Sequence, residues 1–509
     1  MHKCDMVTFI ASCWLGVGSC IASTTDLAPS HPDRPWNPNT TFNGQLLPGT
    51  LANPSATLDY TLPPNPALAV LPPALDVDHE KSYSLAELVD IAESNNPNTR
   101  VAWNDARQAA LAVNLVESAY LPRVTGSAMG AYQSSSKQDS AYGLSLNSNS
   151  SASGAIAALS LEWLLFDFGK RDAIVDAAKQ TSVISNIAFT ATHQQLIYAV
   201  TVAFYAHASA SEHVKTAAKS LENIKTIEDA AQDRYKHGIG TVIEVAQARQ
   251  ASAQANLMLV QANGALEDAY FNLISAMGIS PLTKLKIADI AGRKLSPDML
   301  LPVEKIVTDA LTRRPDVLSA YAAQKVSQAN IAAQEAEFKP KVFVAASVAQ
   351  SSGGVSLTAL PGIGSQAPTI DLSGSRRSGN VFVGVTMPIY DGGMRTTTLA
   401  KARIEAENAE IRLTRVRDDA VHQIILSRNA LNTSLSAYSA AEALLSATQT
   451  TFDAALAAYR SGVGSITELT LAETQLLQAK NTMSDSYNKA LAAATTLALS
   501  TGALGAAPK

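Results

Sequence analysis

Two stretches of this chain, residues 170–237 and 394–461, each run for about 68 residues without a glycine or a proline. Glycine and proline are the residues that most readily end a helix, so each stretch predicts one uninterrupted helix. At a rise of 1.5 Å per residue such a helix is roughly 100 Å long, several times the diameter of a small domain. An ordinary globular core cannot surround it, and the sequence therefore predicts a long, hollow or fibrous assembly.

The two stretches are copies of one pattern. Each ends at a Gly-x-Gly turn, at residues 238–240 and 462–464. Tyr235 lies 224 positions before Tyr459, and the aromatic-Asp-x-Gly segments that precede the stretches, at 166–169 and 390–393, are also 224 apart. The chain is therefore an internal duplication.

Each half has the same order of elements: short helices that end at a proline, two strands, the long helix and a helix that returns beside it. The first repeat is expected at 83–301, with strands at about 122–132 and 154–166, the long helix at about 169–237 and the return helix at about 241–278. The second is expected at 302–502, with strands at about 340–350 and 379–390, the long helix at about 393–461 and the return helix at about 465–501, before a tail at 503–509.

The strands alternate apolar and polar residues along about ten positions. Val381, Val383 and Val385 share one face, for example, while Thr386 lies on the other. This alternation suits strands that cross an outer membrane, although a soluble sandwich uses the same pattern. The Ser-, Gly- and Asn-rich segments 134–153 and 351–378 are expected to be long loops between the strands, as on the outer side of a membrane barrel.

Four strands do not close a barrel, and an open sheet edge in lipid leaves backbone groups without partners. Four strands from each of three chains give a twelve-stranded barrel. The expected fold is therefore an α+β membrane protein, internally duplicated, whose long antiparallel helical hairpins form a tunnel and whose four strands per chain enter a shared trimeric β-barrel. The many Ala, Ser and Thr residues of the helices favour close packing and a thin tunnel wall.

The N-terminus is typical of an exported protein. Residues 1–19 predict a signal peptide with an apolar centre, followed by Cys20 in the segment Val17-Gly18-Ser19-Cys20, which resembles a bacterial lipobox. We expect Cys20 to carry lipid, with ordinary signal cleavage as the alternative. Residues 20–82 are then a lipid-anchored, proline-rich strap. The three cysteines of the chain all precede residue 21, so the remaining sequence offers no disulfide or thiolate metal site.

Composition excludes several classes of function. The net charge is -5 with no basic stripe, which argues against nucleic acid as a partner. The histidines lack metal-ligand spacing, and we find no phosphate loop or nucleophile elbow. We therefore expect neither a cofactor nor an enzyme.

The tips of the hairpins carry a family resemblance. Tyr235-Lys236-His237-Gly238 and Tyr459-Arg460-Ser461-Gly462, with the repeat order, resemble the TolC family of trimeric outer-membrane efflux channels, in its lipoprotein branch. The resemblance covers about Tyr83 to Gly502 and implies a passive homotrimeric conduit in the outer membrane, its tunnel extending into the periplasm. It also implies that the conduit docks a periplasmic adaptor and an inner-membrane pump and exports small molecules.

The resemblance also implies roles for residues at the tip. Gly238, Gly240, Gly462 and Gly464 belong to the turns that contact the adaptor. Glu468 matches the first position of an acidic ring that constricts the tunnel and forms the periplasmic gate.

This sequence departs from the family pattern near that gate. The second acidic position is Leu471, and Gly464 replaces a position that can be basic, so a two-ring gate is in question. Glu468 as a solvated helix-face residue is the alternative to the gate. Glu244, in the equivalent turn of the first repeat, is expected to face the outer groove.

Two other functions remain open at this point. One is the outer-membrane channel of a type I protein secretion system, and the other is a non-conducting periplasmic coiled-coil scaffold. The scaffold accounts for the helices and the duplication but not for alternating strands at matching positions in both halves. The resemblance implies that the pump and the adaptor, rather than this chain, select the transported compounds.

Overall fold

The computed structural model describes residues 68–141, 144–290, 292, 295, 303–358 and 369–505. The chain divides into two units, Met1–Leu75 and Asp76–Lys509. In the first unit the described residues include Leu68, Val70 and Leu71, which are all exposed. The expected signal peptide, Cys20 and most of the proline-rich strap lie outside the described residues, as does the end of the C-terminal tail, 506–509.

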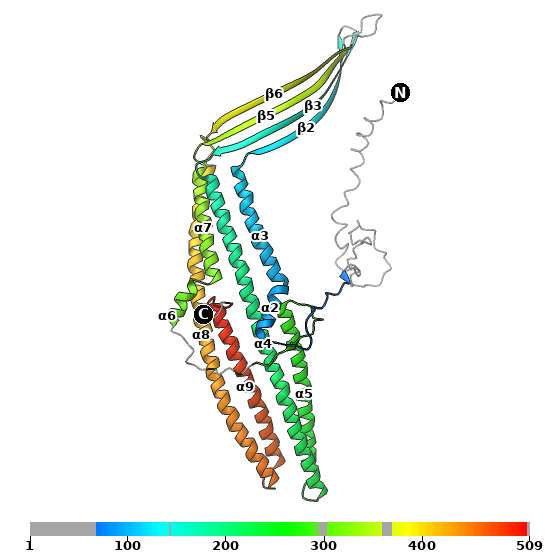
Figure 1. Cartoon of the computed structure of the whole chain (residues 1–509), viewed down its shortest axis with the longest axis vertical. Helices are drawn as coiled ribbons and strands as arrows, with labels where there is room; N and C mark the ends of the chain where they lie inside the picture. The colour runs from blue at the N-terminus through cyan, green and yellow to red at the C-terminus, as the bar shows by residue number, and fades with distance from the viewer. Residues whose placement is uncertain are drawn as a thin grey trace, which may run out of the picture. The chain divides into compact units, whose positions relative to one another are not determined.

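The second unit is built from two repeats of long helices and strands (Figure 1). The helices of the first repeat are α2 (Leu85–Asn95), α3 (Pro97–Glu117), α4 (Lys170–Lys236) and α5 (Val242–Met277), with a short turn of 3-10 helix at Ser118–Tyr120. Those of the second are α6 (Val303–Leu311), α7 (Pro315–Ala336), α8 (Met394–Arg460) and α9 (Ile466–Ser500). Among the helices of the described ranges, none combines the length and the apolar character that a membrane crossing requires. The long helical hairpins, the four long strands and the internal duplication expected from the sequence are confirmed.

The helices begin and end where the sequence changes. Both 67-residue helices, α4 and α8, follow a glycine in the left-handed region, Gly169 at φ 92° and Gly393 at φ 88°. The short helices end shortly before a proline, α2 at Asn95 and α6 at Leu311, because proline restricts its predecessor to extended backbone. Asn96 adopts that conformation, and its side chain accepts a hydrogen bond of 2.8 Å from the backbone N–H of Asn98 at the start of α3.

The four long strands form one antiparallel sheet in the order β2-β3-β5-β6. They are β2 (Arg123–Ala141), β3 (Leu144–Phe166), β5 (Lys341–Thr358) and β6 (Thr369–Thr386). A separate, parallel pair joins β1 (Ser82–Tyr83) to β4 (Lys286–Ile287).

The expectation of long loops at 134–153 and 351–378 is wrong. The strands continue through much of both segments, with Ser134 paired to Ser151 and Ser352 to Ser375. Serine and glycine weaken a strand, but the ladder is built from backbone groups, which these residues also possess. Neighbouring strands on both sides of β3 and β5 extend that ladder beyond the apolar segments.

The register of the sheet separates an apolar face from a mixed one. Residues directly opposite one another in an antiparallel pair share a face. One row therefore joins apolar residues across all four strands: Val124, Leu161, Ala346 and Val381. The adjacent row on the other face is polar: Thr125, Ser160, Ser347 and Asn380.

The sheet joins the long helices through a repeated ion pair. In the first repeat the Nε atom of Arg171 donates to Asp167 at 3.0 Å, and Nη1 donates to the carbonyl oxygen of Leu164 at the end of β3, at 2.7 Å. In the second repeat Arg395 donates to Asp391 at 2.6 Å. Each pair lies in the first turn of its long helix, and in the first repeat the arginine also ties that turn to β3.

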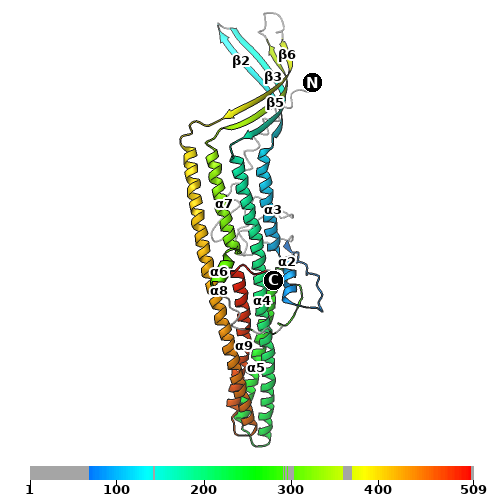
Figure 2. The same ribbon diagram turned by 60° about the vertical axis from the view of Figure 1, so that its left-hand side comes forward.

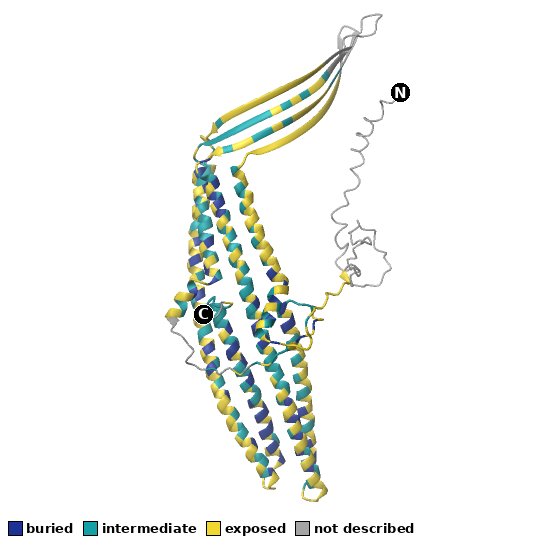
Figure 3. Ribbon diagram, viewed as in Figure 1, coloured by how far each residue is buried: buried dark blue, intermediate teal, exposed yellow. Residues whose placement is uncertain are grey.

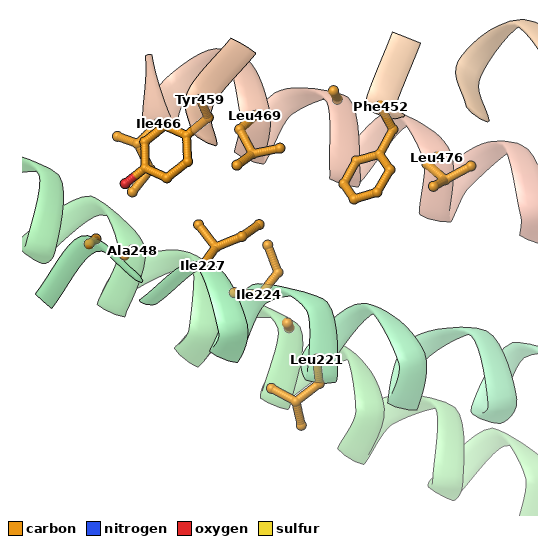
Figure 4. Packing of buried hydrophobic residues seen from close by; sticks show 12 residues of the cluster. Leu221, Ile224, Ile227, Ala248, Phe452, Tyr459, Ile466, Leu469 and Leu476 are labelled. Carbon is orange, nitrogen blue, oxygen red and sulfur yellow. The ribbon is translucent and has the colours of Figure 1, made fainter. Parts of the chain in front are cut away.

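The two hairpins, α4–α5 and α8–α9, run side by side and bury a common core near their tips (Figures 1 and 2). Figure 4 shows that Ile224 and Ile227 of α4 face Phe452 and Leu469 of the second hairpin. Large apolar side chains therefore pack between the hairpins near their tips, together with small residues of the kind that the sequence analysis expected to allow close packing. The remaining helix faces are largely exposed in the single chain (Figure 3).

Candidate functional site at the hairpin tips

The first glycine of each tip supplies a backbone conformation. Gly238 has φ 75° and Gly462 has φ 81°, in the left-handed region that residues with a Cβ atom rarely adopt. The chain reverses there from one helix to the next. Gly238 thus ends α4, and Gly462 ends α8.

The second glycine of each tip lies where there is too little room for a side chain. A Cβ atom on Gly240 would lie 3.0 Å from the backbone nitrogen of Tyr235, and one on Gly464 would lie 3.0 Å from the Cβ of Ala458. Both backbone N–H groups fold back on the preceding helix, since Gly240 donates to Arg234 at 3.1 Å and Gly464 donates to Ala458 at 2.9 Å. The sequence pattern Gly-x-Gly thus encodes two separate requirements.

Glu468 has a structural role that the sequence interpretation missed. Ser465 is the N-cap of α9, and its Oγ accepts a hydrogen bond from the backbone N–H of Glu468 at 3.2 Å. The carboxylate of Glu468 accepts one in return from the backbone N–H of Ser465 at 3.2 Å, which completes a capping box. The pattern Ser-x-x-Glu before an apolar run was the signal that could have identified it. Glu468 is exposed at the tip.

The equivalent position of the first repeat behaves differently. Thr241 caps α5 by accepting from the backbone N–H of Glu244 at 3.2 Å, but α5 has no reciprocal capping box. The Oε2 atom of Glu244 is buried and has no hydrogen-bond partner among the described residues. Glu244 is half-buried and lies near Tyr459 of the second hairpin. That it faces an outer groove of the assembly stays a prediction.

Tyr459 is the centre of this contact between the tips. Its side chain is buried, with 4% exposed, and the guanidinium of Arg234 lies 5.4 Å from the ring centroid. Burial raises the pKa of Tyr459, the cation of Arg234 lowers it and Glu244 raises it. Two groups of the first hairpin thus surround one aromatic side chain of the second.

Tyr235, the repeat equivalent of Tyr459, is 49% exposed. In the single chain, no hairpin covers the face of α4 on which it lies. Further apolar side chains are exposed around both turns: Ile239, Val242, Ile243 and Val463. The tip therefore combines an internally packed side with an exposed apolar end.

A buried carboxylate lies one and a half turns beyond Glu468. Glu473 is 3% exposed, and its Oε1 accepts a hydrogen bond from Asn223 of α4 at 3.3 Å. Burial raises the pKa of Glu473, against the lowering effects of Ser220, Asn223 and Lys480. Sequence reasoning gave this residue no role, because an isolated glutamate on a helix usually faces solvent.

No group of three potential metal ligands occurs among the residues that the structure describes. The predicted tip residues, Gly238, Gly240, Gly462, Gly464 and Glu468, lie in the two adjacent turns.

Long helical hairpins joined to an amphipathic sheet define a class of protein, the channels that extend from an outer membrane as a helical tunnel. The chain belongs to the family described as outer membrane efflux protein, whose family model matches residues 88–279 and 306–503. Members of this family are channels, and the chain is an outer-membrane protein of an efflux system.

Similar proteins support this assignment. Protein CyaE of Bordetella pertussis is 25% identical over 412 residues, which cover 80% of this chain and 81% of that protein. The probable outer membrane lipoprotein SilC of Salmonella typhimurium is 24% identical, over 79% of this chain and 82% of its own. A crystal structure of CusC matches the fold with a TM-score of 0.65 at 19% identity, over 84% of this chain and 95% of that chain.

Proposed function

We propose that three copies of this chain form a passive conduit across the outer membrane. The observation that carries the proposal is the open, amphipathic sheet. Among the described residues β2 and β6 each pair on one side only, and these edge strands are 19 and 18 residues long. An edge of that length needs a partner in lipid, because every unpaired backbone group there costs several kcal/mol. Pairing β6 of one copy with β2 of the next closes a barrel whose apolar face meets lipid.

The polar row of the sheet then lines the pore, and the hairpins continue it as a tunnel into the periplasm. The sequence contains no phosphate-loop pattern, and in this proposal the energy for export comes from a pump in the inner membrane. The conduit accepts the small molecules that this pump and its adaptor deliver. The twelve-stranded barrel and the trimer belong to this proposal.

Conductance of the purified protein in a planar bilayer tests the conduit, together with the mass of the detergent-extracted assembly from light scattering. Three protein masses and steady openings are the expected result. A folded trimer without conductance would refute the conduit, and a monomeric protein that needs no detergent would support the scaffold interpretation.

We propose that the hairpin tips dock the periplasmic adaptor. The exposed apolar side chains Ile239 and Val463, with 69% and 87% of their surfaces exposed, form an apolar end of the kind that partner proteins cover. Gly238, Gly240, Gly462 and Gly464 shape the turns that present them.

A photo-crosslinking residue at Val463 tests this docking in cells that contain the full efflux system. The same residue at Leu257, which is 48% exposed on α5 away from the turns, is the matched control. Crosslinks to an adaptor from Val463 but not from Leu257 are expected. Equal crosslinking from both positions would refute docking at the tip.

We propose that Glu468 lines the narrowest part of the tunnel as a single acidic ring. Its exposure and its position in the first turn of α9 support this role, and three such charges around one axis favour cations. The capping box does not exclude it, because only Oε2 accepts the backbone hydrogen bond and the side chain is exposed. Leu471 follows one turn later, so a second acidic ring is not part of the proposal.

We also propose that Cys20 is lipidated and anchors the mature chain to the outer membrane. The proposal rests on the lipobox-like sequence before Cys20 and on the similarity to SilC, a protein described as a probable lipoprotein. Radioactive palmitate should label the wild-type protein, whereas Cys20→Ser should lose the label. Equal labelling of both would refute lipidation at this residue.

A further inference from the structure

The two repeats fill the space beneath their first short helix in different ways. In the first repeat, α2 packs on α5 through Leu88 and Ala92, which are both fully buried. The facing residues Ile274 and Met277 of α5 are 1% and 0% exposed. Tyr270 closes the same core, since its hydroxyl donates to the carbonyl oxygen of Thr283 at 3.0 Å and accepts from the backbone N–H of Leu285 at 2.8 Å.

The second repeat keeps the short helix but loses the large residues opposite it. Ile306 and Ala310 of α6 lie 218 positions after Leu88 and Ala92, and they have similar sizes. On the return helix the equivalents lie 224 positions after Tyr270, Ile274 and Met277. The equivalents are Ala494 and Ala498 of α9 and Thr501, its C-cap. Every one of the three is smaller than its counterpart.

A cavity of about 410 Å³ occupies the corresponding place. Ile306, Ala310, Ala494, Ala498 and Thr501 all line it. Leu431 and Leu435 of α8 contribute further apolar wall, where the first repeat has His207 and Ser211. These two larger residues do not restore the volume lost on α9. The cavity is therefore a consequence of the divergence of the two repeats.

A buried arginine fixes the positions of the helices that surround this cavity. Arg314, at the turn between α6 and α7, donates to the carbonyl oxygen of Ser500 at 2.6 Å and to Gln423 of α8 at 2.8 Å. It also forms a salt bridge of 2.6 Å with Asp316. These bonds fix the end of α6 relative to α8 and α9, so α6 is not free to move inward and close the space.

We propose that this cavity is a binding site for an apolar small molecule that completes the core of the second repeat. Its volume lies within the usual range of ligand sites, and its lining is apolar apart from Thr501, Asp309 and Arg313. Asp309 and Arg313 are exposed at the rim and have no ion pair among the described residues. A single polar group on the ligand therefore points to the rim, while the apolar part replaces the missing side chains.

Binding at this site requires neither the proposed gate nor adaptor docking. A ligand that binds only the folded protein stabilises it by mass action. Occupancy would therefore hold α6 on α8 and α9 in the way that Tyr270, Ile274 and Met277 hold α2 in the first repeat.

The experiment uses 4-iodophenol, an aromatic probe with one polar group, on crystals of the full-chain protein. The variant Ala498→Ile/Thr501→Met restores two residues of the first repeat and should fill the cavity. Its matched control, Ala447→Ile/Thr450→Met, places the same changes on exposed positions of α8. Anomalous scattering then locates the iodine, and melting temperatures are measured with and without the probe.

We expect an iodine peak between α6, α8 and α9 in the wild-type protein and the control, but not in the filled variant. In the absence of the probe, the filled variant should melt at a higher temperature than the control. Because the cavity of the wild type is open, the probe should raise the melting temperature of the wild type. A detergent alkyl tail in this place before soaking would also support the site.

Two outcomes would overturn the proposal. One is a protein side chain, from this chain or a neighbouring copy, that already occupies the cavity. The other is an iodine peak that is absent from the wild type or unchanged in the filled variant. If the double variant does not fold, Ala498→Val alone should reduce the occupancy of iodine at the same position, and unchanged occupancy would count against the site.

Discussion

Glu468 combines two roles that substitution can separate, the capping of α9 and the proposed acidic ring. Glutamine retains the side-chain oxygen that closes a capping box but has no charge. Glu468→Gln should therefore preserve both 3.2 Å hydrogen bonds with Ser465 and remove three charges from the trimer. Glu468→Ala should remove both the charge and the returning hydrogen bond.

The two variants should consequently differ from each other in stability but have the same ion selectivity. Loss of a helix cap costs about 1 kcal/mol, so Glu468→Ala should destabilise each chain by about that amount, whereas Glu468→Gln should leave the melting temperature nearly unchanged. Both should weaken the preference for cations. The measurements are thermal unfolding of the purified trimer and the reversal potential of single channels under a salt gradient.

Glu244→Gln is the matched control, because Glu244 is the equivalent residue of the first repeat but is half-buried beside Tyr459. This control should not change the reversal potential. If Glu468→Gln leaves selectivity at the wild-type value, the acidic ring is refuted and the role of Glu468 is limited to capping. If Glu244→Gln changes selectivity equally, the assignment of the constriction to α9 is refuted.

Three further predictions concern the core of the hairpins and the turns. Burial raises the folded-state pKa of Glu473, so its charged form opposes folding at neutral pH. Glu473→Gln should therefore raise the melting temperature at pH 8, and this gain should disappear as the pH falls below the ordinary pKa of glutamate. A gain that does not depend on pH would contradict this explanation. Gly462→Ala should cost about 1–2 kcal/mol through its φ of 81°, visible as a lower melting temperature, and an unchanged value would show that the turn relaxes. Leu469→Ala, at a fully buried position between the hairpins, should cost about 2–5 kcal/mol in thermal unfolding, with exposed Leu444→Ala as a nearly neutral control.

Much of the helical part follows from local sequence. The positions of α4 and α8 reflect the absence of glycine and proline over about 68 residues, and Pro97 and Pro315 mark the start of α3 and α7. Such residues act through backbone geometry, which does not depend on what lies nearby. This is why a single sequence is sufficient to predict these elements.

The strands illustrate where local reasoning fails. Ser134 and Ser135 carry no strand signal of their own, yet they pair with Ser151 and Ser150. Their pairing depends on neighbouring strands that are far away in sequence, since Ser151 pairs in turn with Ser356. Strand propensity describes each residue in isolation. A prediction from propensity therefore made the strands too short.

The tip shows a second kind of information that a duplicated sequence does not contain. Repeat equivalence treats Tyr235 and Tyr459 as the same residue, but one is 49% exposed and the other 4%. The second hairpin lies against the first on one side only, so Tyr459 meets Arg234 while the corresponding face around Tyr235 remains open.

If the assembly is a closed ring of three chains with approximate sixfold symmetry, that open face must meet the second hairpin of the next chain. The equivalents of Arg234 and Glu244 there are Ala458 and Glu468. Contacts within a chain and between chains at the tip therefore differ in chemistry: an arginine faces the tyrosine in one and an alanine in the other. Opening of the tip should consequently loosen the contacts between chains before those within a chain.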